Sequence, residues 1–153
     1  MGQNNPLIEI KRLPQLIRLD NKFPLPKYET IGSAGMDLRV CQAGTIQSRE
    51  IVSLPTGIAI AVPHGWEVQI RSRSGLALKK GIVVVNSPGT VDSDYRGEIK
   101  LILTNITDSI YHYNIGDRMA QMVISPVGFA RLLEVEELNQ TDRGIGGFGS
   151  TGS

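Results

Sequence analysis

The sequence predicts one all-β domain, built as a sandwich, a jelly roll or a barrel. Short runs rich in β-branched residues recur along the chain, spaced roughly ten residues apart. Clusters of Pro, Gly, Asn and Asp separate these runs, and such residues favour turns. In residues 66–71 apolar side chains alternate with polar ones, which is the period of two of a half-buried strand. A chain of 153 residues most simply forms one core.

The strands are expected where the β-branched runs lie. In chain order these runs are residues 51–54, 57–62, 66–71, 82–85, 99–104 and 119–124. Turns are expected at residues 54–57, 63–65, 87–89, 115–117 and 125–126. One short helix is expected over residues 75–80, with Ser74 as its cap and Gly81 as its end. The segment 131–138 has some helical propensity, but its apolar spacing does not decide its structure.

The C-terminus is predicted to be a flexible glycine-rich arm. We assign residues 1–138 to the β domain and residues 139–153 to the arm, which belongs to the same single domain. Five of the last eleven residues are glycine, and glycine-rich backbone loses much entropy on ordering. The same stretch holds Arg143, Phe148 and hydroxyl groups, which suit a phosphate, a base and phosphate oxygens respectively. We therefore expect a lid that becomes ordered on a ligand.

Composition narrows the class of protein. A net charge of +1 without a basic block gives no reason to expect nucleic-acid binding. The lone Cys41 cannot form an intrachain disulfide, so a small buried thiol in the cytoplasm is expected. With one cysteine and two histidines, a structural zinc site or a Ser-His or Cys-His triad is not expected. No long apolar run or signal peptide is visible, so we expect a cytoplasmic protein without a membrane span.

Two stretches carry candidate phosphate and proton-transfer chemistry. Residues 71–77 place two arginines at a strand end and Ser74 at the helix start, where they can bind an anion; a capped helix beside solvated charges is the alternative. Residues 86–97 include Asp92 and Asp94, which point to opposite faces if the segment is extended. Only one would then face a ligand, where an ionised carboxylate can accept a proton from water; a polar hairpin turn is the alternative. Tyr95 is either a core aromatic or a flat wall for a sugar.

Three further features leave alternatives open or are set aside. Asp37 lies in a strand of small residues, where it pairs with a buried arginine or contacts a hydrated metal through water. Gln121, in an otherwise apolar strand, either faces solvent or contacts a phosphate or a base. Gly144, Gly146 and Gly149 match the spacing of a dinucleotide fingerprint, but no strand and helix flank them, so that interpretation is rejected.

Taken in order, five stretches of the chain resemble the five motifs of the trimeric deoxyuridine triphosphatase (dUTPase) family. They are residues 34–38, 73–77, 86–97, 118–121 and 143–151, and the likeness spans residues 23–152. The resemblance implies a jelly-roll-like distorted barrel with one short helix, a flexible C-terminal arm and a homotrimer with active sites at subunit interfaces. It implies hydrolysis of dUTP to dUMP and pyrophosphate with Mg²⁺, which supplies dUMP for thymidylate synthesis and keeps uracil out of DNA.

The resemblance also implies a role for each site residue. Asp92 activates the water that attacks the α-phosphorus, and Asp37 contacts the metal through water. Tyr95 packs on deoxyribose and leaves no room for a 2′-hydroxyl. The uracil-binding hairpin, which excludes a thymine methyl by size and a cytosine amino group by donor mismatch, consists of Asn86, Gly89, Thr90 and Val91. Phosphate contacts come from Arg73, Ser74, Gly75 and Gln121. The arm of a neighbouring subunit adds Arg143 on the γ-phosphate, Phe148 on the uracil, and Gly149, Ser150 and Thr151 on phosphate.

Two other functions are alternatives. A dCTP deaminase shares the fold but needs an acid–base residue, usually a glutamate near the helix, and residues 76–80 contain no carboxylate. A non-catalytic nucleotide-sensing protein is the second alternative, against which the intact Asp92, Arg143 and Phe148 count.

Overall fold

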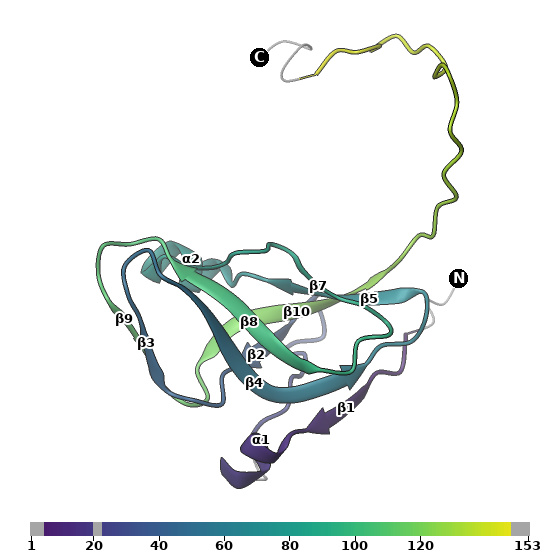
Figure 1. Cartoon of the computed structure of the whole chain (residues 1–153). Coiled ribbons are helices and arrows are strands. Elements are labelled where there is room, and N and C mark those ends of the chain that lie inside the picture. The colour runs from purple at the N-terminus through teal and green to yellow at the C-terminus, as the bar shows by residue number, and fades with distance from the viewer. Residues whose placement is uncertain (1–4, 20–22, 148–153) are drawn as a thin grey trace.

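Two antiparallel sheets form the body of the protein in a computed structural model that describes residues 5–19 and 23–147 (Figure 1). The first sheet has the order β1 (Glu9–Arg12), β4 (Ile51–Ala61), β8 (Glu98–Asn105) and β6 (Ile82–Val84). The second has the order β2 (Met36–Arg39), β10 (Arg118–Pro126), β5 (Trp66–Arg71) and β7 (Gly89–Val91). A two-stranded sheet pairs β3 (Gly44–Ile46) with β9 (Tyr111–Tyr113). The predicted all-β, jelly-roll-like class is confirmed.

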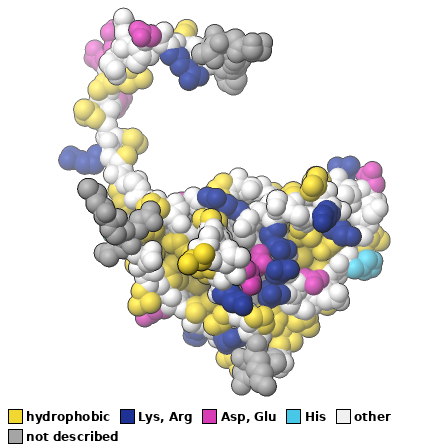
Figure 2. Space-filling view, turned by 180° about the vertical axis from the view of Figure 1, so that it is seen from behind, with side chains coloured by type: hydrophobic (Ala, Val, Ile, Leu, Met, Phe, Trp, Pro, Cys, Tyr) yellow, Lys and Arg dark blue, Asp and Glu magenta, His cyan; other side chains and the backbone are white. Residues whose placement is uncertain are grey.

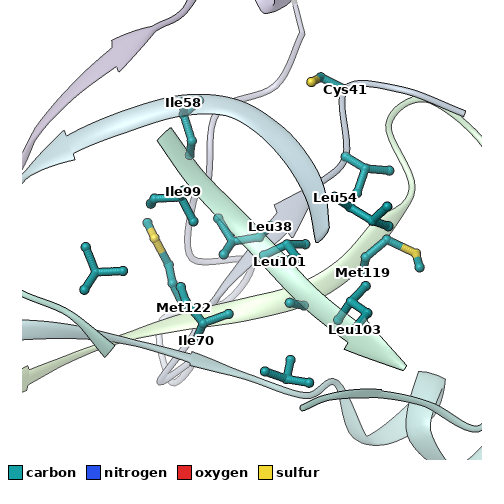
Figure 3. Close-up of a cluster of buried hydrophobic side chains, with 14 of the residues drawn as sticks. Leu38, Cys41, Leu54, Ile58, Ile70, Ile99, Leu101, Leu103, Met119 and Met122 are labelled. Atoms are coloured by element: carbon teal, nitrogen blue, oxygen red, sulfur yellow. The ribbon is translucent and has the colours of Figure 1, made fainter. Parts of the chain in front are cut away.

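Apolar side chains from both large sheets meet in one core (Figure 3). Along β8, Ile99, Leu101 and Leu103 are buried, while the alternate residues Lys100 and Ile102 are exposed. This alternation puts one face of the sheet in the core and the other in solvent, as the period of two requires. Each fully buried large aliphatic side chain contributes about 1.5–3 kcal/mol relative to exposure, so the core dominates the stability of the fold.

The turn expected at residues 54–57 is wrong, because the two strands expected on either side of it form the single long strand β4. The pairing of β4 with β8 shifts register between Pro55 and Ala59, and Gly57 has a φ of +71°. Neighbours satisfy the polar groups of this bulge: the Gly57 amide donates to Glu98 Oε1 at 2.8 Å, and its carbonyl accepts from the Leu13 amide at 2.8 Å. The Pro and Gly therefore kink the strand rather than end it.

Two helices are present among the described residues, where one was expected. The missed helix, α1 (Pro14–Leu19), begins at a proline, whose fixed φ suits a first helical position, and it buries Leu16 in the core. The expected helix is α2 (Ser74–Lys80), and Gly81 ends it with a φ of +63°, as predicted. The cap assigned to Ser74 is wrong, because the helix begins at Ser74 and Arg73 occupies the cap position.

After β10 ends, residues 127–147 form no helix or strand and arch away from the body (Figure 1). Two contacts hold the root of this arm: the Val127 amide donates to the Gly65 carbonyl at 2.9 Å, and the Phe129 ring stacks on His64 with centroids 4.7 Å apart. The helical propensity of residues 131–138 produces no helix, and the division of the chain at residue 138 stays a prediction. Within the described residues, no helix has the length and apolarity to cross a membrane.

Candidate active site

Asp37 lies at the centre of an ion-paired cluster on the second sheet. In the pairing of β2 with β10, Asp37 lies opposite Gln121. In the pairing of β10 with β5, Gln121 lies opposite Arg71. Asp37 Oδ1 lies 2.7 Å from Arg73 Nε, and Asp37 Oδ2 lies 3.1 Å from Arg118 Nη1. Arg73 also donates through Nη1 to the Arg118 carbonyl at 2.8 Å. The sequence left open whether Asp37 pairs with an arginine or contacts a hydrated metal, and the pairing with arginine is observed.

Gln121 is directed to the same cluster rather than to solvent. Its Nε2 donates to the Ser72 carbonyl at 3.0 Å, which ties β10 to the segment between β5 and α2. Gly35 lies so close that an added Cβ would stand 2.5 Å from Gln121 Oε1. Because this oxygen stays an available acceptor and Nε2 has a second hydrogen, Gln121 can still contact a ligand.

The start of α2 faces open space beside this cluster. Ser74 and Gly75 are exposed, and nothing lies within 4 Å of a Cβ built on Gly75. The first amides of a helix have no acceptor inside the helix, so they can bind an anion. The helix carries Lys79 and Lys80 in its last turn and no carboxylate in its sequence. Figure 2 shows basic side chains gathered around acidic ones on one face of the body.

A pocket of about 350 Å³ brings together the candidate nucleoside-binding residues. Its wall contains every described residue that the sequence assigned to the uracil, the sugar and catalysis: Asn86, Gly89, Thr90, Val91, Asp92 and Tyr95. Strands β4, β5 and β8 complete the wall with Ser53, Ile70, Glu98, Ile99, Lys100 and Ile102. Residues from strands β4, β5, β7 and β8 and from the segments beside β7 thus line one hollow, whose volume is within the range of small-molecule sites.

Strand β7 gives this pocket a polar edge. Among the described residues, β7 is the last strand of its sheet and pairs with β5 alone, so its other edge has free backbone groups. Gly89 is buried, and a Cβ added there would stand 3.1 Å from Asn86 Nδ2. The missing side chain therefore lets the Asn86 amide lie against the strand, where amide and backbone groups together can match the polar edge of a base.

The segment after β7 turns instead of running extended. The Tyr95 amide donates to the Asp92 carbonyl at 3.2 Å, with Ser93 and Asp94 in the turn between them. Asp92 and Asp94 were expected on opposite faces only if this segment were extended, and that condition is not met. Both carboxylates are exposed, and Asp92 lines the nucleoside pocket whereas Asp94 is absent from its wall.

Tyr95 is a pocket wall and not a core aromatic. The residue is 44% exposed, and its hydroxyl donates to the Glu98 carbonyl at 2.9 Å. A ring held at its far end by the backbone presents a fixed flat surface, which is the geometry that suits packing on a sugar.

A sequence model of the dUTPase family matches residues 21–152. The chain belongs to the dUTPase family. It is 50% identical over 145 residues to the deoxyuridine 5′-triphosphate nucleotidohydrolase of Fusobacterium nucleatum, a match that covers 94% of this chain and 99% of that protein.

Solved dUTPase structures have the same fold. A mutant dUTPase of Staphylococcus bacteriophage 80alpha, bound to dUpNHpp, superposes with a TM-score of 0.85 at 23% identity and covers 99% of this chain and 100% of that one. A mutant dUTPase of the S. aureus phage phi11, which coordinates a structural Mg(II) ion, has a TM-score of 0.76 at 21% identity and covers 88% and 99%. At these identities the likeness establishes the dUTPase architecture.

The candidate site residues in the described part of the chain fall into two groups. The wall of the nucleoside pocket does not include Arg73, Ser74, Gly75 or Gln121. Arg143 lies exposed on the arm, where its Nε donates to the Gly146 carbonyl at 2.8 Å. The remaining arm residues assigned to the site, Phe148, Gly149, Ser150 and Thr151, lie outside the described residues.

The side chains of the described residues can be compared with the ligands that a Mg²⁺ ion requires. Within residues 5–19 and 23–147, no group of three or more His, Cys, Asp or Glu side chains is placed to hold a metal ion. Each Asp37 oxygen lies within ion-pair distance of an arginine, and Oδ2 also accepts a hydrogen bond from Arg118 Nη1. Mg²⁺ keeps several waters and commonly binds substrate phosphates through few protein ligands. The donor set therefore fits a metal carried mainly by phosphates and water.

Three residues of the candidate site had no role predicted from the sequence. Ser72 accepts from Gln121 through its carbonyl, and its hydroxyl accepts from the Val84 amide at 2.9 Å. Arg118 shares Asp37 with Arg73, and Gly35 provides the space for Gln121. These contacts follow from the register of β2, β10 and β5, which no local sequence pattern specifies.

The lone thiol lies apart from this chemistry. Cys41 is buried and donates to the Pro55 carbonyl at 3.4 Å. Burial, and then the negative charge of Glu98, raises the pKa of the Cys41 thiol above its ordinary value. A protonated, inaccessible thiol is a poor nucleophile, which agrees with the expectation of a small buried core residue.

Proposed function

We propose that this dUTPase hydrolyses dUTP to dUMP and pyrophosphate by attack of an Asp92-activated water on the α-phosphorus. One observation carries the proposal: Asp92 lies in the wall of the same pocket as Asn86 and Tyr95. A carboxylate is thus placed beside groups suited to a base and a sugar. The reaction supplies dUMP for thymidylate synthesis and removes a precursor of uracil in DNA.

Uracil is read at the edge of β7. The free backbone groups of that edge and the Asn86 amide pair with the polar edge of the base. Since Gly89 has no side chain and is buried, the approach is narrow and a 5-methyl group is excluded by size. Cytosine presents a donor where uracil presents an acceptor, and a buried mismatch of this kind discriminates strongly. The Tyr95 ring packs on the deoxyribose and leaves no space for a 2′-hydroxyl.

Asp92 acts as the general base. Its side chain is exposed at the pocket, so a water can approach it without displacing a protein partner. The carboxylate takes one proton from this water as the water oxygen bonds to the α-phosphorus. The bond from that phosphorus to the oxygen that bridges the α- and β-phosphates breaks, and pyrophosphate leaves with this oxygen. Positioned base catalysis of this kind contributes about 10²–10⁴-fold to the rate.

The Asp37 cluster binds the phosphates. Arg73 pairs with Asp37 through Nε and donates to the Arg118 carbonyl through Nη1, and its Nη2 group is then left to reach phosphate oxygens. Ser74 and Gly75 offer a hydroxyl and amides at the open start of α2, and Gln121 adds an amide. When bound, Mg²⁺ neutralises charge on the triphosphate. We propose that Asp37 contacts this ion only through water, since both of its oxygens are paired.

Complete sites form between the subunits of a homotrimer. Two observations support this assembly: the nucleoside pocket and the phosphate-binding cluster are separate within one chain, and the arm leads away from its own body (Figure 1). Leu132, Leu133 and Leu138 of the arm are 84% exposed or more, which is apolar surface that a neighbouring copy would cover. We propose that this arm carries Arg143 to the γ-phosphate and Phe148 to the uracil of a neighbour's site, with Gly149, Ser150 and Thr151 on phosphate.

A substrate panel tests the function. The protein is incubated with each deoxynucleoside triphosphate and Mg²⁺, while pyrophosphate, ammonia and binding are followed separately. We expect pyrophosphate from dUTP alone. Ammonia from dCTP would identify a deaminase, and binding without turnover would identify a nucleotide sensor; either result would reject the proposal.

A further inference from the structure

The ring of Tyr95 rests on a glycine two residues further along the chain. A Cβ added at Gly97 would stand 2.5 Å from Tyr95 Cζ and 3.0 Å from Cε2, and closer still to the hydroxyl oxygen. These distances are well inside van der Waals contact between carbon atoms, which is about 3.5–4.0 Å. The ring therefore lies where the side chain of any other residue at position 97 would be.

The backbone conformation of Gly97 does not itself require glycine. Gly57, Gly65, Gly81, Gly116 and Gly144 have a positive φ, and Gly97 is not among them. An alanine at position 97 would thus avoid the left-handed region, and the three nearest atoms to its Cβ all belong to the Tyr95 side chain. The glycine is needed for space and not for conformation.

The backbone beneath the ring is held firmly in place. The Tyr95 hydroxyl donates to the Glu98 carbonyl at 2.9 Å. The Glu98 side chain accepts from the Gly57 amide and from Gln15 Nε2, each at 2.8 Å, and so ties the start of β8 to the bulge in β4 and to α1. Ile99, the next residue, is 2% exposed. A methyl group at position 97 would therefore move the ring, because this backbone is fixed.

We infer that Gly97 is a positioning residue for sugar discrimination. Because Gly97 has no side chain, the Tyr95 ring can occupy the space above it, and this sets how far the ring projects into the nucleoside pocket. Gly97 does not line the pocket and acts only through Tyr95. This inference rests on the proposed function, in which the ring excludes a 2′-hydroxyl. A displaced ring no longer matches the edge of the deoxyribose, so preference for dUTP over UTP falls.

The test is a double-mutant cycle read as the ratio of kcat/KM for dUTP to kcat/KM for UTP. Gly97→Ala should lower this ratio about ten-fold or more, because a displaced ring no longer excludes the 2′-hydroxyl that distinguishes UTP from dUTP. In the Tyr95→Ala background, the same change should alter the ratio less than about two-fold, because residues that act through one contact are not additive. Gly32→Ala is the matched control, since nothing lies within 4 Å of a Cβ there, and it should leave the ratio unchanged.

The outcomes separate this inference from the proposed function. An unchanged ratio in Tyr95→Ala rejects the sugar-wall role itself, and the Gly97 inference with it. A lowered ratio in Tyr95→Ala with an unchanged ratio in Gly97→Ala rejects the inference alone, as does an equal effect of Gly97→Ala in both backgrounds. If Gly97→Ala does not fold, the double variant decides: folding of Gly97→Ala/Tyr95→Ala supports a collision with the ring, and failure of both overturns it.

Discussion

Arg73 Nε lies 2.7 Å from Asp37 Oδ1, and both side chains are largely buried. The same carboxylate pairs with Arg118 through its other oxygen. One negative charge therefore orients two guanidinium groups beside the neighbouring strands β2, β10 and β5. Breaking a partly buried pair costs more than breaking an exposed one, because the arginine that remains loses its partner while still shielded from water.

Asp37→Asn should weaken the phosphate-binding end of the site. With the charge removed, Arg73 loses its ion pair and keeps its bond to the Arg118 carbonyl. We expect kcat/KM for dUTP to fall about 10–100-fold, mainly through KM. Steady-state kinetics checks this, with Asp108→Asn as the matched control: Asp108 pairs with Arg49 at 3.1 Å on an exposed surface, where such pairs contribute little. Unchanged kinetics in Asp37→Asn would show that Arg73 needs no carboxylate partner in order to bind the phosphates.

Asp92→Asn should bind dUTP yet turn it over slowly. The amide keeps the size and polarity of the carboxylate but is a poor base, so kcat should drop about 10²–10⁴-fold while the Kd for dUTP changes little. Isothermal titration and single-turnover kinetics measure the two quantities. Asp94→Asn serves as the control, since Asp94 does not line the nucleoside pocket, and it should stay near the parent rate. Full activity in Asp92→Asn would assign the base elsewhere.

Two inactive variants should restore activity when they share a trimer. One carries Asp92→Asn, and the other ends at residue 142 and so lacks the arm residues assigned to the neighbour's site. After both are unfolded and refolded together, some sites combine an intact Asp92 with an intact arm. We expect partial recovery of dUTP hydrolysis in mixed trimers confirmed by native mass spectrometry. Mixed trimers without recovery would mean that the arm serves its own chain.

Gly57→Ala should destabilise the fold without altering the site directly. Gly57 has a φ of +71°, and an added Cβ would stand 2.7 Å from Leu16 Cβ in the helix α1. Strain in the left-handed region and this contact together should lower the free energy of unfolding by about 1–3 kcal/mol. Urea unfolding at a fixed protein concentration measures it, with Gly32→Ala as the unstrained control. Equal midpoints for the two variants would contradict a tight bulge.

The sequence was most informative where local rules decide the structure. The alternation in residues 66–71 predicted β5, and Gly81 predicted the end of α2, because periodicity and a left-handed cap are local properties. The turn predicted at Pro55 and Gly57 was wrong, because their polar groups find partners outside the local pattern. The polar groups of Gly57 pair with Glu98 and Leu13, and the Pro55 carbonyl accepts from the Cys41 amide. Cross-strand contacts had no local signal either, so Arg118 and Ser72 were not assigned to the site.

Isotope transfer from water tests the catalytic role of the Asp92 pocket most directly. The enzyme is allowed to turn over dUTP once in H₂¹⁸O with Mg²⁺, and the products are separated for mass spectrometry. Attack of an activated water on the α-phosphorus, beside the nucleoside that Asn86 and Tyr95 hold, predicts one ¹⁸O in dUMP and none in pyrophosphate. Label in pyrophosphate would place the attack on the β-phosphorus and contradict this mechanism.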